Sequence, residues 1–165
     1  MRRATLPLFL CALTLTACTT QRVSNERDAL AVVHLGQALD SRRYSIDIQT
    51  MYPRRGGGRT VSYGFSLTVK GDTLVSYLPY FGRAYSLPYG GGKGLNFTER
   101  IGSYHEQLTP KGSRHIELQT RNDEDNYLFT IDIQSNGRAY IHLQPHQRES
   151  ISYDGEVNLD HDKLP

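Results

Sequence analysis

The chain has 165 residues, with 19 basic and 17 acidic side chains and two cysteines. This length suffices for one domain with a substantial hydrophobic core. The nearly balanced charge argues against a general nucleic-acid binder, because such proteins need a basic surface. It argues equally against attachment to a membrane by charge alone.

The first residues have the pattern of an export signal. A basic start at residues 1–3 is followed by an apolar stretch at residues 4–15. About a dozen apolar residues are typical of a signal peptide, whereas a membrane-spanning helix needs roughly 20. The run Leu15-Thr16-Ala17-Cys18 resembles the bacterial lipobox. This resemblance implies cleavage before Cys18, a diacylglycerol thioether on its sulfur and acylation of the new amine.

Removal of the signal peptide changes the charge and the cysteine content. It takes away two arginines and no acid, which leaves 148 residues with 17 basic and 17 acidic side chains. Cys11 leaves with the signal peptide, and Cys18 is consumed by lipid. We therefore expect a mature domain that is stabilised by its core rather than by disulfides.

The rest of the chain predicts a single domain. We expect a signal peptide at 1–17, a lipidated tether at 18–24, a β-rich domain at 25–157 and a C-terminal tail at 158–165. A helix is predicted from Glu26 to Leu39, because Val32, Leu35 and Leu39 form one apolar stripe.

After Ser41 the apolar period changes to two, which indicates half-buried strands. The expected strands are 44–49, 61–69, 73–78, 101–108, 115–119, 127–133, 139–144 and 150–153. Short turns join them, and Asn136-Gly137 predicts a type I′ hairpin. About eight sequential antiparallel strands must close or pack in pairs, because open edges invite aggregation. We expect a lipocalin-like up-and-down barrel covered by the helix, with a two-sheet sandwich as the alternative.

Two stretches interrupt the strand pattern. Residues 53–59 form a basic glycine-rich loop, whose Arg54, Arg55 and Arg59 suit lipid phosphates or acidic glycans. Residues 79–94 form an aromatic, glycine-rich loop that either closes the barrel end or lines a pocket there. Such a pocket would suit a small apolar ligand or lipid. The candidate ligand-binding residues are Tyr77, Tyr80, Phe81, Arg83, Tyr85 and Tyr89.

Part of this region resembles a known family. The runs Lys70-Gly71-Asp72-Thr73 and Ser76-Tyr77-Leu78-Pro79-Tyr80-Phe81-Gly82-Arg83-Ala84-Tyr85 are similar to the signature of an uncharacterised lipoprotein family of Bacteroides-type bacteria, domain of unknown function 4251. The resemblance extends from the predicted helix to about Gly155. It implies a β-rich domain behind a lipobox and an outer-membrane setting, and it supplies no catalytic residues.

The sequence offers no catalytic, metal or cofactor signature. Gly90-Gly91-Gly92-Lys93-Gly94 lacks the hydroxyl residue and the following helix of a phosphate loop. His142 and His146 are four residues apart on a predicted strand, about 13 Å, which is too far for one metal. His115 is expected to lie opposite Glu106, which provides only two ligands where zinc needs three or four. No Gly-x-Ser-x-Gly motif occurs, so we expect no cofactor, no metal and no catalytic residue.

These observations predict a lipid-anchored envelope protein that binds a small apolar ligand or lipid. Its partner is the membrane, through the lipid on Cys18. Because Thr19-Thr20-Gln21-Arg22 contains no acid, the family resemblance favours the periplasmic face of the outer membrane. The alternatives are an interaction or scaffold lipoprotein without a pocket, and a hydrolase whose acid cluster the sequence does not reveal.

Overall fold

The structure, a computed structural model, describes residues 19–86 and 94–159, with the side chains of the helix described from residue 29. One helix precedes nine strands. The elements are α1 (Thr19–Asp40), β1 (Arg43–Pro53), β2 (Arg59–Thr60), β3 (Ser66–Lys70), β4 (Thr73–Leu78), β5 (Leu95–Leu108), β6 (Arg114–Arg121), β7 (Asn126–Ile133), β8 (Arg138–Pro145) and β9 (Ile151–Asn158).

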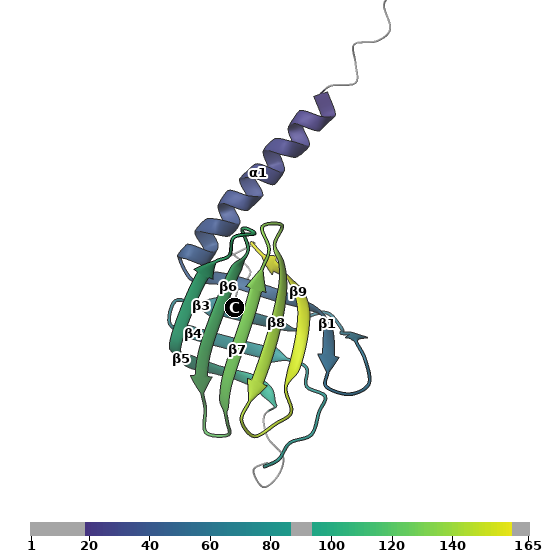
Figure 1. The fold of residues 1–165 in the computed structure, drawn as a ribbon, viewed down its shortest axis with the longest axis vertical. Helices are drawn as coiled ribbons and strands as arrows, with labels where there is room; N and C mark the ends of the chain where they lie inside the picture. The colour runs from purple at the N-terminus through teal and green to yellow at the C-terminus, as the bar shows by residue number, and fades with distance from the viewer. Residues whose placement is uncertain (1–18, 87–93, 160–165) are drawn as a thin grey trace, which may run out of the picture.

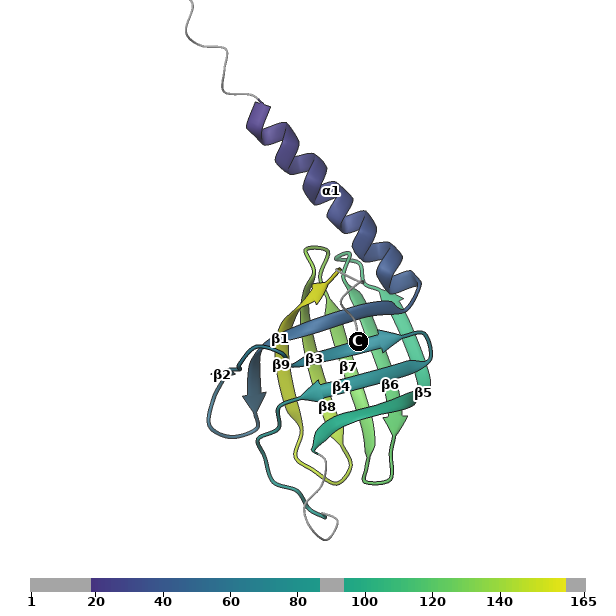
Figure 2. The ribbon, with the colours of Figure 1, turned by 180° about the vertical axis from the view of Figure 1, so that it is seen from behind.

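The strands form a closed antiparallel barrel. Apart from the short β2, each strand pairs with the next along the chain, and β9 returns to pair with β1. This seam runs from Ser45 opposite Asn158 to Pro53 opposite Ile151. Figures 1 and 2 show β1, β3 and β4 crossing the direction of β6–β9, with the long β5 continuing from one set to the other. The predicted eight-strand barrel is confirmed, and β2 is an extra strand paired to β1.

A glycine allows the two seam strands to approach closely. The register of the β1–β9 pair shifts between Ile48 and Thr50, and Gly155 lies opposite Ile48. A Cβ on Gly155 would lie 2.3 Å from the backbone oxygen of Asp47, well inside van der Waals contact. Only glycine leaves room for the backbone there, as is common at bulges and close strand crossings.

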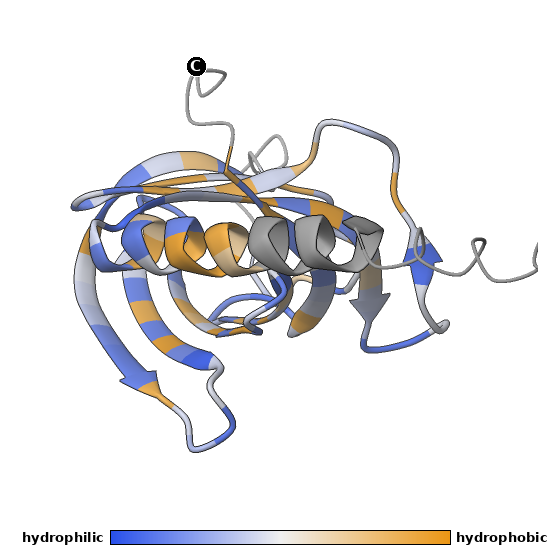
Figure 3. Ribbon diagram, turned by 90° about the horizontal axis from the view of Figure 1, so that it is seen from above, coloured by the Kyte–Doolittle hydropathy of each residue, from blue (hydrophilic) through white to orange (hydrophobic). Residues whose placement is uncertain are grey.

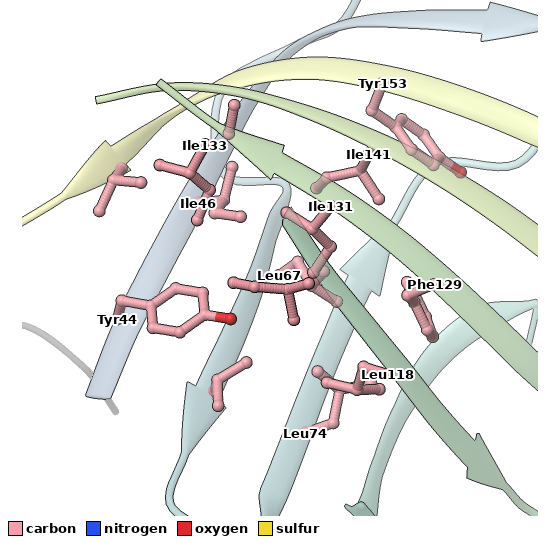
Figure 4. Close-up of a cluster of buried hydrophobic side chains, with 14 of the residues drawn as sticks. Tyr44, Ile46, Leu67, Leu74, Leu118, Phe129, Ile131, Ile133, Ile141 and Tyr153 are labelled. Carbon is pink, nitrogen blue, oxygen red and sulfur yellow. The ribbon is translucent and has the colours of Figure 1, made fainter. Parts of the chain in front are cut away.

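The alternating apolar side chains fill the barrel. Ile46, Leu67, Leu74, Leu118 and Phe129 each expose 0 % of their surface, and Figure 4 shows these side chains pointing into the same interior. Because a fully inaccessible side chain borders no space large enough for a water molecule, these residues pack directly against one another. The described part of the barrel centre therefore holds no room for a ligand.

The helix closes one barrel end with its last turns. Leu35, Ala38 and Leu39 are buried, and Figure 3 shows α1 lying across the mouth of the barrel. Leu30 remains 58 % exposed, and Val32, predicted to share the buried stripe, is exposed as well. The N-terminal part of α1 projects beyond the barrel (Figure 1).

The helix also begins earlier than the sequence indicated. It starts at Thr19 rather than near Glu26, so residues 19–24 of the predicted tether are helical. At 1.5 Å per residue, the 22 residues of α1 span about 33 Å. We call its projecting N-terminal part the arm of α1.

Two local predictions were wrong. The alternation from Val61 to Phe65 does not form a strand, because β3 begins only at Ser66 and Gly64 has a φ of 106°. The β7–β8 hairpin is confirmed, but its turn is not type I′, since Gly137 has positive φ and Asn136 does not. The backbone amide of Gln134 donates to the carbonyl of Arg138, and the amide of Gly137 donates to the carbonyl of Gln134. This is the pattern of a three-residue turn with a glycine bulge.

Candidate functional site

The aromatic loop begins as a segment fixed to the β8–β9 connection. We call residues 79–86 the lid segment. The Tyr85 amide donates to the carbonyl of Gln147 at 2.7 Å, and the Glu149 amide donates to that of Arg83 at 2.9 Å. An isolated bridge joins Ala84 to Arg148. In Figure 1 the segment follows this connection toward the barrel end opposite α1.

Tyrosine hydroxyl groups hold the lid segment to the barrel. The single proton of the Tyr80 hydroxyl is shared between two carbonyl oxygens, that of Arg83 at 3.0 Å and that of Glu149 at 3.1 Å. The Tyr153 hydroxyl, inside the barrel, donates to the Pro79 carbonyl at 2.8 Å. Burial raises the pKa of both phenols, so they stay protonated donors at neutral pH. At Gly82 a Cβ would lie 2.6 Å from the Tyr80 hydroxyl, which explains the small residue.

The basic loop meets this segment. We call the β1–β2 connection with Arg54, Arg55 and Arg59 the arginine hairpin. The Arg59 guanidinium carbon lies 4.0 Å from the ring centroid of Phe81, a cation–π contact. Nη2 of Arg55 lies 4.0 Å from Oε1 of Glu149. The fold thus brings together the basic loop at residues 53–59 and the first part of the aromatic loop, which are separate in the sequence.

These residues surround a small pocket, which we call the lid pocket. Its volume is about 360 Å³, and its lining residues are Arg55, Tyr80, Phe81, Gly82, Arg83 and Glu149. The side chain of Arg83, on the lid segment, is exposed, and so is that of Arg54, which neighbours Arg55 on the arginine hairpin. The carboxylate of Glu149, whose side chain is only 8 % exposed, accepts a hydrogen bond from the Arg83 amide at 3.2 Å. Arginines therefore outnumber carboxylates around the lid pocket.

A buried ion pair supports the β8–β9 connection. Nη2 of Arg148 lies 2.7 Å from Oε2 of Glu124, and its Nη1 donates to the Gly94 carbonyl at 2.5 Å. Asp125 accepts hydrogen bonds from the backbone amides of residues 126, 146 and 147. The acidic stretch at 122–126 thus has a structural role in holding the β8–β9 connection.

The candidate residues proposed from the sequence have different positions. Tyr80, Phe81 and Arg83 lie together at the lid pocket, whereas Tyr77 faces outward on β4 and stacks on Phe65 with centroids 5.1 Å apart. Tyr85 is exposed. Tyr89 and most of the 90–94 glycine run lie outside the described residues.

Sequence reasoning missed Glu149 and did not connect Arg55 with the lid pocket. Neither residue stands in a recognisable motif with residues 80–83. The Arg83 amide and the Glu149 carboxylate that accepts from it are 66 positions apart. Only the strand order brings these residues together.

Among the described histidines, His105, His115 and His142 are on strands, and none of these three is buried. Nδ1 of His115 is 2.6 Å from Asp132 and its Nε2 is 3.8 Å from Glu117. The hydrogen bond to Asp132 raises the pKa of His115. The predicted opposition of His115 and Glu106 was wrong: Gln107 lies opposite His115, and Glu106 binds Arg114 instead. Among the described residues, no three His, Cys, Asp or Glu side chains form a metal-binding group.

A wider groove of about 890 Å³ runs over β5–β8. The cross-strand row Ser103, Gln119, Leu128 and Gln144 forms part of its floor. Its charged residues, Glu99, Arg100 and Arg121, are not buried. The lid pocket is the stronger candidate because it combines a buried carboxylate, an aromatic ring and several arginines.

Comparisons with known proteins show a family and a fold. Residues 26–157 match the model of the domain of unknown function DUF4251. A crystal structure of a DUF4251 family protein from Bacteroides eggerthii is similar, with a TM-score of 0.58 and 13 % identity, over 80 % of this chain and 89 % of that chain. No curated protein matches. Within the described residues, no helix has both the length and the apolar character needed to cross a bilayer.

Proposed function

The chain belongs to the DUF4251 family, whose domain has no known function, and from that premise we propose that it is a lipid-anchored envelope lipoprotein that binds an acidic glycan at the lid pocket. The observation that carries this proposal is the meeting of the arginine hairpin with the lid segment. Arg59 stacks on Phe81, and Arg55 approaches Glu149.

The arginines around the lid pocket support an acidic ligand. Arg54, Arg55, Arg59 and Arg83 lie on the arginine hairpin and the lid segment, while the mature chain as a whole is neutral. Guanidinium groups bind carboxylates and phosphates through paired hydrogen bonds. A local basic surface on a neutral protein favours one acidic partner rather than general attraction to anions.

The packing of the barrel interior supports a ligand site outside the barrel. Side chains at the barrel centre, such as Ile46, Leu67 and Phe129, are 0 % exposed, so an apolar molecule held there has no support. The aromatic residues of the lid segment are instead on the surface, where Phe81 is 49 % exposed. The ligand-binding role expected of this loop is retained, with a different ligand and position.

The position of the pocket favours a glycan over a lipid surface. We propose that Cys18, immediately before α1, carries the lipid and that the protein faces the periplasm from the outer membrane. The arm of α1 leads away from the barrel, and the lid segment runs toward the opposite end (Figure 1). A membrane holding the lipid would therefore lie on the far side from the lid pocket.

The anchor is tested by replacing Cys18 with serine. We expect the wild-type protein to fractionate with membranes and Cys18→Ser to become extractable without detergent, because the sulfur carries the lipid. Intact mass of the wild-type protein should show cleavage before residue 18 and the added acyl chains. An unmodified thiol at this position would refute the anchor.

Glycan binding is tested with the triple variant Arg55→Ala/Arg59→Ala/Arg83→Ala in the Cys18→Ser background. We expect binding to purified cell-wall sacculi of the host to weaken by about tenfold or more, since charged hydrogen bonds contribute about 1.5–3 kcal/mol each when desolvated. Co-sedimentation measures the affinity, which should also fall with salt.

The matched control removes three other arginines. Arg100, Arg121 and Arg138 are exposed on β5, β6 and β8, and their triple alanine variant changes the net charge equally. An equal loss of affinity for sacculi in both variants would indicate that binding depends on total charge rather than on the lid pocket, and it would refute the site. Binding of the wild type to anionic vesicles but not to sacculi would refute the glycan and indicate a lipid surface.

A further inference from the structure

Within the described residues, one carboxylate oxygen of the lid pocket has no hydrogen-bond donor. Oε2 of Glu149 accepts a hydrogen bond from the Arg83 amide at 3.2 Å. Oε1 accepts none from the described residues, and its ion pair with Arg55, at 4.0 Å, is too long for a hydrogen bond. The side chain is more than nine-tenths buried, yet it lines the pocket. A carboxylate oxygen at a pocket wall can accept hydrogen bonds from a ligand.

The surroundings of Oε1 restrict which donors can reach it. An ammonium group would suit a lone carboxylate, but Arg55, Arg59 and Arg83 lie around the same pocket or on its rim. Their combined positive charge repels a cation. A neutral donor on the ligand, such as a hydroxyl group, can approach Glu149 without this repulsion.

The other walls of the pocket add two requirements. Arg55 and Arg83 offer guanidinium groups, which select an acidic group on the ligand. Phe81 offers an apolar ring wall, with Arg59 held against it. A pocket of about 360 Å³ is near the lower end for small-molecule sites, which favours one ring-sized unit.

We propose that the lid pocket binds one sugar-acid unit of an acidic glycan, whose hydroxyl groups donate to Oε1 of Glu149 while its carboxylate is held by Arg55 and Arg83 and its ring packs against Phe81. This inference rests on the proposed function and specifies the unit recognised. It requires that Glu149, although negatively charged, strengthens the binding of an acidic ligand.

The test compares two acidic probes on the full-length chain in the Cys18→Ser background. Oligogalacturonate carries carboxylates and hydroxyl groups on rings, whereas linear polyphosphate carries charge alone. We expect Glu149→Gln to weaken oligogalacturonate binding by about tenfold or more, because an amide is a poorer acceptor than a carboxylate. Polyphosphate binding should stay the same or tighten, because one negative charge is removed. Isothermal titration calorimetry measures both affinities.

A second variant covers the case in which Glu149→Gln unfolds. Phe81→Leu retains an apolar side chain without the ring, and we expect it to weaken oligogalacturonate binding severalfold and to leave polyphosphate binding unchanged. Thermal melts verify that each variant is folded.

The outcomes separate the two proposals. If the folded variants bind oligogalacturonate as tightly as the wild type does, the sugar-acid inference is refuted, while arginine-dependent binding to sacculi still supports the proposed function. Tighter oligogalacturonate binding by Glu149→Gln, or equal loss for both probes, refutes the inference as well. Loss of sacculi binding in both arginine variants refutes the proposed function itself.

Discussion

Gly155→Ala is expected to lower the free energy of unfolding by about 3 kcal/mol or more, at the upper end of what overpacking costs. The new Cβ would lie 2.3 Å from the Asp47 carbonyl oxygen and 3.0 Å from Cγ2 of Ile46. Neither β1 nor β9 can retreat easily, because their pairing closes the barrel. Urea denaturation of the Cys18→Ser chain, followed by circular dichroism, measures the change.

Gly36→Ala serves as the matched control. This glycine is on α1, and a Cβ there meets nothing within 4 Å. Alanine is the better helix former, so the control should be neutral or stabilising by up to about 1 kcal/mol. If Gly155→Ala unfolded at the same urea concentration as the wild type, the close crossing of the seam strands would be contradicted.

Arg148→Met is expected to cost about 3–5 kcal/mol, the usual penalty for breaking a buried ion pair from one side. The substitution takes the guanidinium away from the Glu124 carboxylate, which stays buried, and from the Gly94 carbonyl. The lid segment bridges to residue 148 as well. The same denaturation experiment gives the magnitude.

A double variant distinguishes the cost of leaving Glu124 as an unpaired buried charge from the cost of changing the shape of the side chain at residue 148. Arg148→Met/Glu124→Gln removes both charges, and it should recover a large part of the stability, because replacing a whole buried pair is much less costly than breaking it. Arg100→Met is the exposed control. Its side chain is 86 % exposed and lies 4.0 Å from Asp72, so it should cost less than about 1 kcal/mol. A similar small effect of Arg148→Met would contradict the buried pair.

The barrel could be predicted because its strands carry a local signal. Phe129, Ile131 and Ile133 alternate with wetter residues, and the structure buries all three. Sequential alternating segments joined by short turns leave few topologies, and closure removes the edges. Alternation alone misled at residues 61–65, where Gly64 takes a positive φ that a strand does not accommodate.

The candidate site was only partly predictable. The unusual composition of the lid segment was visible, but its attachment through Tyr80 to Glu149 depends on residues 69 positions apart. The direction of Glu149 into the lid pocket also depends on the Arg83 amide, a backbone group that the side-chain pattern does not indicate. Contacts of this kind follow from the closed strand order and not from local spacing.

The closed seam restricts how this protein can recognise anything. Recognition by strand addition requires an unpaired backbone edge long enough to hold an extended peptide. In the described chain the extra strand β2 offers two residues, and the longest strand, β5, pairs with β4 through residues 95–100 and with β6 through residues 101–108. Each half of β5 therefore keeps one unpaired edge. Strand addition is therefore confined to the open edges of β5, and elsewhere affinity must come from side chains, such as those on the connections between strands.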